Sequence, residues 1–159
     1  MKDTTVLDSL VGNASHISIV VHTHPDGDAI GSGTAMLCYL TQSRGKDAAL
    51  IVPDSIPDSI SFITRGAADG SILVFDEEKE RASARINASD LIICLDCNSF
   101  SRTSGMEDAL RQSKAPKVLI DHHLNPDIEA FGLVFSETEV SSASELFTLE
   151  VFIKHYTTS

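Results

Sequence analysis

The chain has few basic residues for its size. Twelve Lys and Arg stand against 23 Asp and Glu, which gives a formal net charge of −11 over 159 residues. A protein that holds a polyanion by Lys and Arg alone shows the opposite balance. Long duplex nucleic acid is therefore not an expected partner. A small phosphorylated ligand is still acceptable, because bound cations can supply positive charge locally.

Cysteines, long apolar runs and a leader segment are also scarce or missing. The three cysteines form no even disulfide framework, which favours a reducing, cytoplasmic location. No apolar run approaches the ~20 residues of a membrane span, and no basic segment followed by an apolar stretch opens the chain. We therefore expect neither secretion nor a membrane partner. Cys94 and Cys97 form a C-x-x-C that starts inside an apolar run, which favours packing over redox or zinc chemistry.

Apolar segments alternate with amphipathic ones along the chain. Strands are predicted over 16–22, 48–52, 71–75, 91–96, 117–121 and, as a short strand, 131–137. Helices are predicted over 4–13, 29–43, 77–86 with Asp76 as N-cap, 106–113 and 144–156, with a short helix or turn over 57–63. This alternation indicates an α/β domain with a mainly parallel sheet and helices on both faces.

Acidic residues and histidines directly follow three of the predicted strands. They are His22, His24, Asp26 and Asp28 in the segment HTHPDGD, then Asp96, and then Asp121, His122 and His123. The carboxyl ends of parallel strands meet at one edge, where open α/β sheets bind ligands. Carboxylates crowded at that edge repel one another, and a divalent cation removes the repulsion. One such segment is equally well a polar loop, but three together favour a functional site.

The type of donor narrows the choice of metal. Carboxylates and imidazoles without a thiolate suit Mn²⁺, Mg²⁺, Fe²⁺ or Zn²⁺ rather than a soft metal. The sequence therefore predicts a divalent cation site at the carboxyl edge of the sheet.

The segments HTHPDGDAIGS, LDCNS and DHH resemble successive motifs of the DHH phosphoesterase family. The resemblance runs from residue 16 to the end of the chain. It is nearest to the branch of nanoRNases and pAp phosphatases, with RecJ exonucleases, cyclic-dinucleotide phosphodiesterases and manganese pyrophosphatases as relatives. It implies the fold of a DHH N-terminal domain and a phosphoesterase that uses two divalent cations, Mn²⁺ foremost. The implied substrates are short single-stranded oligoribonucleotides or 3′-phosphoadenosine 5′-phosphate (pAp), a small phosphorylated nucleotide.

The resemblance also implies a set of metal ligands. His22, Asp26 and Asp96 would hold one cation, and Asp28, Asp96 and His122 would hold the other. Asp96 would bridge the pair and keep the ions about 4 Å apart for in-line attack on phosphorus.

Four further residues are expected to take roles around these ligands, His123 and Asp121 by the same resemblance. His123 would be catalytic and face the substrate, where it would donate to a phosphate oxygen or the leaving group. Asp121 would support catalysis by orienting a ligand imidazole. His24 and Arg102 would bind substrate, with Arg102 as a phosphate clamp. Each of these two is also readily explained as an ordinary exposed residue.

Two features of the family pattern have no counterpart in the sequence. Enzymes that the chain resembles carry another metal-binding aspartate on a later strand and a second, substrate-holding domain. We therefore expect residues 1–159 to form a catalytic domain that is incomplete at its C-terminus, weakly active alone and able to associate, for example as a homodimer. Two alternatives stay open: a cyclic-dinucleotide phosphodiesterase or pyrophosphatase on the same metal core, and a catalytically silent domain that binds a partner.

Overall fold

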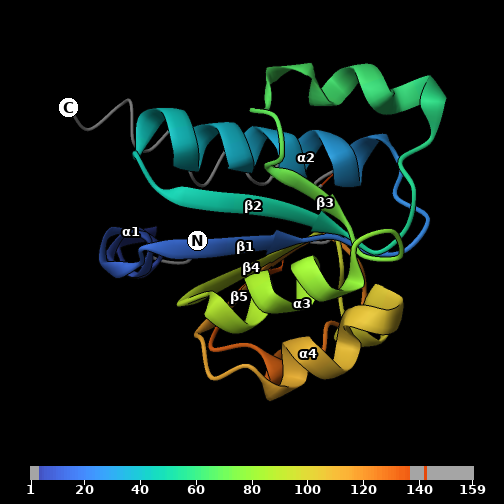
Figure 1. The fold of residues 1–159 in the computed structure, drawn as a ribbon. Coiled ribbons are helices and arrows are strands. Elements are labelled where there is room, and N and C mark those ends of the chain that lie inside the picture. Colours follow the sequence, from blue (N-terminus) through green and yellow to red (C-terminus); the bar gives the residue numbers. More distant parts are fainter. Residues whose placement is uncertain (1–3, 137–141, 143–159) are drawn as a thin grey trace.

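Parallel strands form the centre of the molecule, and helices cover both faces of the sheet (Figure 1). The computed structural model describes residues 4–136 and residue 142. Within them the strands are β1 (His16–Val20), β2 (Asp47–Val52), β3 (Ile72–Val74), β4 (Leu91–Leu95), β5 (Lys117–Asp121) and β6 (Leu133–Ser136). Their spatial order is β3-β2-β1-β4-β5-β6, and every neighbouring pair is parallel. The predicted α/β fold class is confirmed.

The helices divide between the two faces of the sheet. They are α1 (Thr4–Asn13), α2 (Gly27–Cys38), α3 (Lys79–Ala88) and α4 (Glu107–Gln112). Short 3₁₀ segments span Asp58–Gly66, Phe100–Met106 and Ile128–Ala130, and a π turn over Tyr39–Ser43 extends α2. Figure 1 shows α2 on one face and α3 and α4 on the other. Two buried apolar clusters follow this division, one reaching α1 and α2 and the other α3 and α4.

The alternation of side chains along β1 explains these two clusters. Successive residues of a strand point to opposite faces of the sheet. Ile17 and Ile19 accordingly join the cluster with α2, while Val20 joins the cluster with α3. Ser18 is also buried, and its hydroxyl group meets that of Ser89 at 2.6 Å. A strand that is buried on both faces needs apolar residues at nearly every position, and β1 has this nearly continuous apolar sequence.

The strand order reverses direction between β1 and β4. From β1 the chain moves outward through β2 and β3, and it then returns to the other side of β1 to build β4, β5 and β6. In open parallel sheets, ligands bind at the carboxyl edge next to such a switch point. The loops that follow β1 and β4 carry His22 and Asp96 to this position.

Two helix starts differ from the sequence-based expectation. The helix α2 begins at Gly27 because the Asp26 carboxylate accepts a hydrogen bond from the Ala29 amide at 3.0 Å. The prediction that Asp76 caps the next helix is wrong. The amides of Glu77 and Glu78 donate to the Val74 carbonyl in a turn, so α3 starts only at Lys79, after Glu78.

The remaining predicted elements fall close to the observed ones. The segment predicted over 131–137 contains β6, and that predicted over 57–63 overlaps the 3₁₀ segment Asp58–Gly66. The helix predicted over 144–156 lies outside the described residues. In the part of the chain that is described, no helix is both long enough and apolar enough to cross a membrane.

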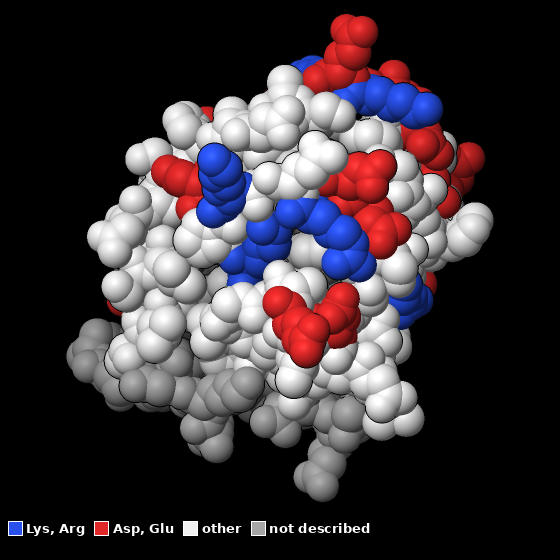
Figure 2. Space-filling model, turned by 90° about the horizontal axis from the view of Figure 1, so that it is seen from below, with Lys and Arg blue, Asp and Glu red and all other residues white. Residues whose placement is uncertain are grey.

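Figure 2 views the face of the molecule on the side of α3 and α4. Basic side chains gather near its middle, and acidic side chains border them. Two ion pairs at the starts of these helices keep the signs mixed: Arg81 bonds to Glu78 at 2.9 Å, and Arg111 bonds to Glu107 at 3.0 Å. On this face, acidic side chains border the basic ones, so the basic residues do not form a continuous track that could bind a polyanion.

Candidate metal centre

His22 lies at the carboxyl end of β1 with its side chain almost fully buried. Its Nδ1 donates to the carbonyl of Thr23 at 2.6 Å. Its Nε2 faces Asp96 Oδ2 at 3.2 Å and Asp26 Oδ1 at 3.9 Å. A proton fixed on Nδ1 leaves the lone pair of the neutral imidazole on Nε2, which is how a metal-ligating histidine is usually oriented.

Asp96 lies at the centre of the cluster and is 1% exposed. It directly follows β4 in a left-handed backbone conformation, with φ at 53°, that aspartate tolerates better than most residues. Its amide donates to the Ile120 carbonyl at 3.1 Å, which fixes the turn. Oδ2 faces His22, and Oδ1 faces His122 Nε2 at 3.2 Å. One carboxylate therefore presents an oxygen to each of two imidazoles.

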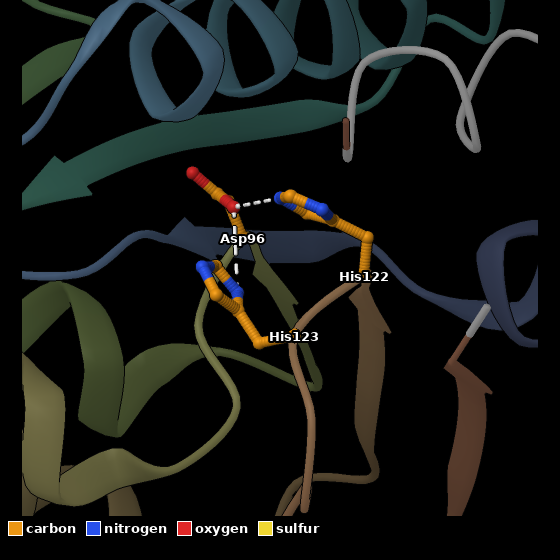
Figure 3. Close-up of side chains that lie close together, drawn as sticks. All are labelled: Asp96, His122 and His123. Carbon is orange, nitrogen blue, oxygen red and sulfur yellow. Dashed lines mark hydrogen bonds and ion pairs between the residues drawn. The ribbon is translucent and has the colours of Figure 1, made fainter. Parts of the chain in front are cut away.

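The adjacent histidines after β5 both turn toward Asp96 (Figure 3). His122 Nε2 lies 3.2 Å from Asp96 Oδ1 and 3.4 Å from Asp28 Oδ2. His123 Nδ1 lies 3.6 Å from Asp96 Oδ1 and 2.6 Å from Asp121 Oδ1. The sequence expected Asp121 to orient a ligand imidazole, but its observed bond is to His123, the residue expected to face the substrate.

At the centre of the cluster, two atoms that both accept hydrogen bonds face each other. A neutral imidazole nitrogen with a lone pair and a carboxylate oxygen are both acceptors. At 3.2 Å, His22 Nε2 and Asp96 Oδ2 need a proton or a cation between them. Without a cation the proton is favoured: the hydrogen bond to Asp96 raises the pKa of His22 above its ordinary 6.5, although burial opposes the shift. A positive charge belongs between these groups.

Asp121 adds a second unsatisfied acceptor. Its side chain is fully buried, and Oδ1 accepts from His123. Its Oδ2 has no hydrogen-bond partner among the described residues. Because a buried carboxylate without full partners is costly, such groups concentrate where binding or catalysis requires them.

The five residues expected as metal ligands lie close together at this edge of the sheet. Ligand atoms of His22, Asp26 and Asp96 lie within 4.8 Å of one another, as do those of Asp96, His122 and His123. Asp28 reaches the second group through its 3.4 Å contact with His122. Oxygen and imidazole donors of this kind fit a hard or borderline divalent cation.

The two expected substrate contacts lie beside this cluster. The His24 side chain is 94% exposed, and its Nδ1 lies 3.3 Å from Asp54 Oδ2. Arg102 is half-buried and close enough for its charge to oppose protonation of His22. Its guanidinium has no hydrogen bond or ion pair within the part of the chain that is described. Its carbonyl accepts from the Thr23 amide at 2.7 Å, which ties the two loops together.

Sequence reasoning missed Asp54 as a member of this edge. Its carboxylate also accepts from the His24 amide at 2.9 Å. The sequence contains a pattern that indicates this place, because Asp54 comes shortly after β2 and Asp96 comes directly after β4.

Cys94 and Cys97 are both buried, and Cys97 Sγ donates to the Ser99 carbonyl at 3.0 Å. Burial and this contact are what the expected packing role requires.

Comparisons with known proteins bear on this site. The family model described as "DHH family, N-terminal domain" matches residues 16–156. The cyclic-di-AMP phosphodiesterase GdpP of Bacillus subtilis is 28% identical over 151 residues, and the match covers 89% of this chain and 22% of that protein. The chain thus spans about a fifth of this curated relative.

Two solved structures are also similar to this chain. An exopolyphosphatase-related protein from Bacteroides fragilis is 35% identical with a TM-score of 0.86, covering 92% of this chain and 42% of that one. RecJ from Thermus thermophilus, solved in complex with Mn²⁺, is 19% identical with a TM-score of 0.51, covering 92% of this chain and 19% of that one. The second likeness is one of fold alone.

Proposed function

Because the chain belongs to the DHH family, whose N-terminal domain matches residues 16–156, we propose that it is the catalytic domain of a metal-dependent phosphoesterase. The proposed substrates are small phosphorylated nucleotides, with pAp and short single-stranded RNA as the first candidates. The observation that carries the proposal is the Asp96 carboxylate, which offers one oxygen to His22 and the other to His122 at 3.2 Å each.

The donor set fits a pair of divalent cations that share Asp96. His22, Asp26 and Asp96 would hold one, and Asp28, Asp96 and His122 would hold the other. Mn²⁺ is the proposed metal, since it accepts both carboxylate and imidazole ligands. When bound, such a pair lowers the pKa of a water and stabilises the charge that develops on the phosphoryl oxygens.

Residues next to the proposed ligands would fix the positions of the histidine protons for this reaction. The Thr23 carbonyl holds the His22 proton on Nδ1, so Nε2 stays available as a ligand. The Asp121 carboxylate likewise holds a proton on His123 Nδ1 and leaves Nε2 to meet the substrate. His123 would then donate a proton to the leaving oxygen or bind a phosphate oxygen. Asp121 is thus proposed as a positioning residue for His123.

Arg102 is the proposed phosphate clamp. Its guanidinium is always protonated, and its planar group of donors suits a phosphate. It is half-buried beside His22 without a carboxylate partner in the described ranges. Binding a phosphate there would pair this charge. His24, which is exposed on the same loop, is proposed as a peripheral substrate contact.

A second candidate keeps the same metal centre with a different substrate. The relative GdpP is named as a cyclic-di-AMP phosphodiesterase. This favours a cyclic dinucleotide as the alternative to pAp and short RNA. Both reactions attack phosphorus with an activated water, so the same residues would act in either.

The test is hydrolysis under single-turnover conditions, with the protein in excess over substrate so that slow cleavage is visible. pAp, a diribonucleotide, cyclic-di-AMP and pyrophosphate are offered in turn with and without Mn²⁺. We expect Mn²⁺-dependent cleavage of at least one nucleotide, its loss in Asp96→Asn and its retention in Asp47→Asn, which removes a carboxylate at the other edge of the sheet. Cleavage that persists in Asp96→Asn contradicts the proposal. Mn²⁺ binding without any cleavage favours a silent binding domain instead.

A further inference from the structure

A polar hollow opens at the carboxyl edge of the sheet, next to the candidate metal centre. Its volume is about 450 Å³, and its lining residues are Thr23, His24, Asp54, Asp76, Ser101 and Ser104. They come from the loops that follow β1, β2, β3 and β4, which meet at the right-hand end of the sheet in Figure 1. All of these residues are polar, and His24 contributes the one aromatic ring among them, so the hollow mainly offers hydrogen bonds.

Thr23 forms the wall between the hollow and the metal centre. Its carbonyl accepts from His22 Nδ1 at 2.6 Å, and its amide donates to the Arg102 carbonyl at 2.7 Å. Thr23 is also one of the residues that line the hollow. A ligand whose phosphate lay between His22 and Arg102 would therefore place its next chemical group at the hollow.

The lining residues differ in their remaining capacity for hydrogen bonds. Asp54 is engaged by the backbone amide and the ring of His24, and Ser101 Oγ bonds to Ser99 Oγ at 3.0 Å. In the part of the chain that is described, the side chains of Thr23, Asp76 and Ser104 have no hydrogen-bond partner. Two hydroxyl groups and one carboxylate are thus free to meet a ligand.

The charge of the hollow limits what this ligand can be. The carboxylates of Asp54 and Asp76 would repel a second phosphate. They would instead accept hydrogen bonds from neutral hydroxyl groups, and a bond to an ionised acceptor is stronger than one between neutral groups. Apart from the exposed His24 ring, which contacts Asp54 at 3.3 Å, the lining residues offer no aromatic surface on which a nucleobase could stack. A sugar with adjacent hydroxyl groups satisfies both conditions.

We propose that this hollow binds the ribose of a ribonucleotide, with the Asp76 carboxylate accepting a hydrogen bond from the 2′-hydroxyl group. The proposal rests on the function proposed above, because it needs the phosphate at the metal centre. It makes the hollow the part of the site that distinguishes ribonucleotides from deoxyribonucleotides. The base would then project away from the hollow.

The test compares AMP with 2′-deoxy-AMP as ligands of the Mn²⁺-loaded protein by isothermal titration calorimetry. AMP is expected to bind about tenfold more tightly, since hydrogen bonds to charged groups contribute energies of that order. Asp76→Ala should bring the ratio of the two Kd values close to one. Thr23→Val should lower the ratio while keeping the backbone contact to His22. Asp69→Ala is the matched control, because Asp69 is an exposed acid in the turn before β3, away from the hollow.

The outcomes separate this proposal from the proposed function. If neither nucleotide binds in a Mn²⁺-dependent way, the phosphate site fails and the ribose site fails with it. If both bind equally well to the unchanged protein, or if Asp76→Ala keeps the preference for AMP, only the ribose site is overturned. A fall in the number of bound Mn²⁺ ions in Asp76→Ala would also overturn it, because the hollow would then be a cation site.

Discussion

The two edges of the sheet carry similar residues in opposite states. At the amino edge, Asp90 accepts from the amides of Ser15 and His16 at 2.8 and 2.9 Å. Asp47 there is held by Arg85 at 2.9 Å and by His16 at 2.8 Å. At the carboxyl edge, Asp96 faces imidazole nitrogens, and the buried Oδ2 of Asp121 has no partner among the described residues. Asp47 and Asp90 are thus satisfied at the amino edge, whereas in the described part of the chain one oxygen of Asp121 is left open at the carboxyl edge.

We interpret this difference as one between carboxylates that stabilise the fold and carboxylates that are available to bind a ligand. Hydrogen bonds from Arg85 lower the pKa of Asp47 despite some desolvation, so its charged form suits the folded state. At the other edge the pKa of His22 is raised by Asp96, which means that the site draws in a positive charge. The chain can pair its acids where only stability is required. Where it does not, a functional reason is the better explanation.

The largest expected effect that sharpens this contrast comes from Asp121→Asn. The change keeps the shape of the side chain but weakens its hold on the proton of His123 Nδ1. We expect kcat to fall about 10–100-fold, as for other partners of site histidines. Mn²⁺ should still stabilise the variant, and the pH profile of kcat should change because the hydrogen bond to His123 Nδ1 is altered. An unchanged profile with unchanged kcat would remove Asp121 from the positioning role.

A smaller effect is expected in the pH dependence of stability without metal. The raised pKa of His22 gives a stabilisation that is fully present below pH 6.5 and is lost as pH rises through the folded-state pKa. The melting temperature of the metal-free protein should therefore fall as pH rises above 6.5. In His22→Asn this slope should flatten, whatever the absolute stability of the variant. An equal slope in both proteins would show that the His22–Asp96 contact is not its source.

The smallest effect belongs to the amino edge. Asp47→Asn removes a partly exposed ion pair with Arg85, and about 0.5–1 kcal/mol of stability should be lost at neutral pH. Because the pKa of Asp47 is lowered, its contribution is full above the ordinary value of 3.8 and disappears as pH falls through the folded-state pKa. Urea unfolding at pH 7 and pH 3 measures both. A change in Mn²⁺ affinity in this variant would break the contrast between the edges.

Much of the carboxyl edge could be predicted because it depends on local pattern. The strand predicted over 117–121 matches β5 to the residue, since an apolar run lies between Pro116 and the histidines. Once strands and helices alternate, parallel pairing brings the residues after each strand to one edge. The approach of His22, Asp96 and His122 follows from that rule alone.

The details that failed depend on contacts between distant segments or on backbone conformation. Asp76 resembles an N-cap, but the amides after it turn back to Val74 and delay the helix. The choice of His123 over His122 as the partner of Asp121 depends on how the chain leaves β5, which no sequence spacing encodes. The link between Thr23 and Arg102 joins loops that are far apart in the sequence. Such contacts become visible only once the sheet is assembled.

The most direct test of the central claim is the effect of Mn²⁺ on thermal unfolding. At a hundredfold excess over its Kd, a ligand that binds only the folded state stabilises by about 2.7 kcal/mol, which is roughly 5–10 °C for a domain of this size. We predict this shift for the unchanged protein and for Asp47→Asn, and its absence in Asp96→Asn. Metal-free Asp96→Asn should also lose the pH-dependent stabilisation that the His22–Asp96 contact provides. No shift with millimolar Mn²⁺, or the same shift in Asp96→Asn, would contradict the account.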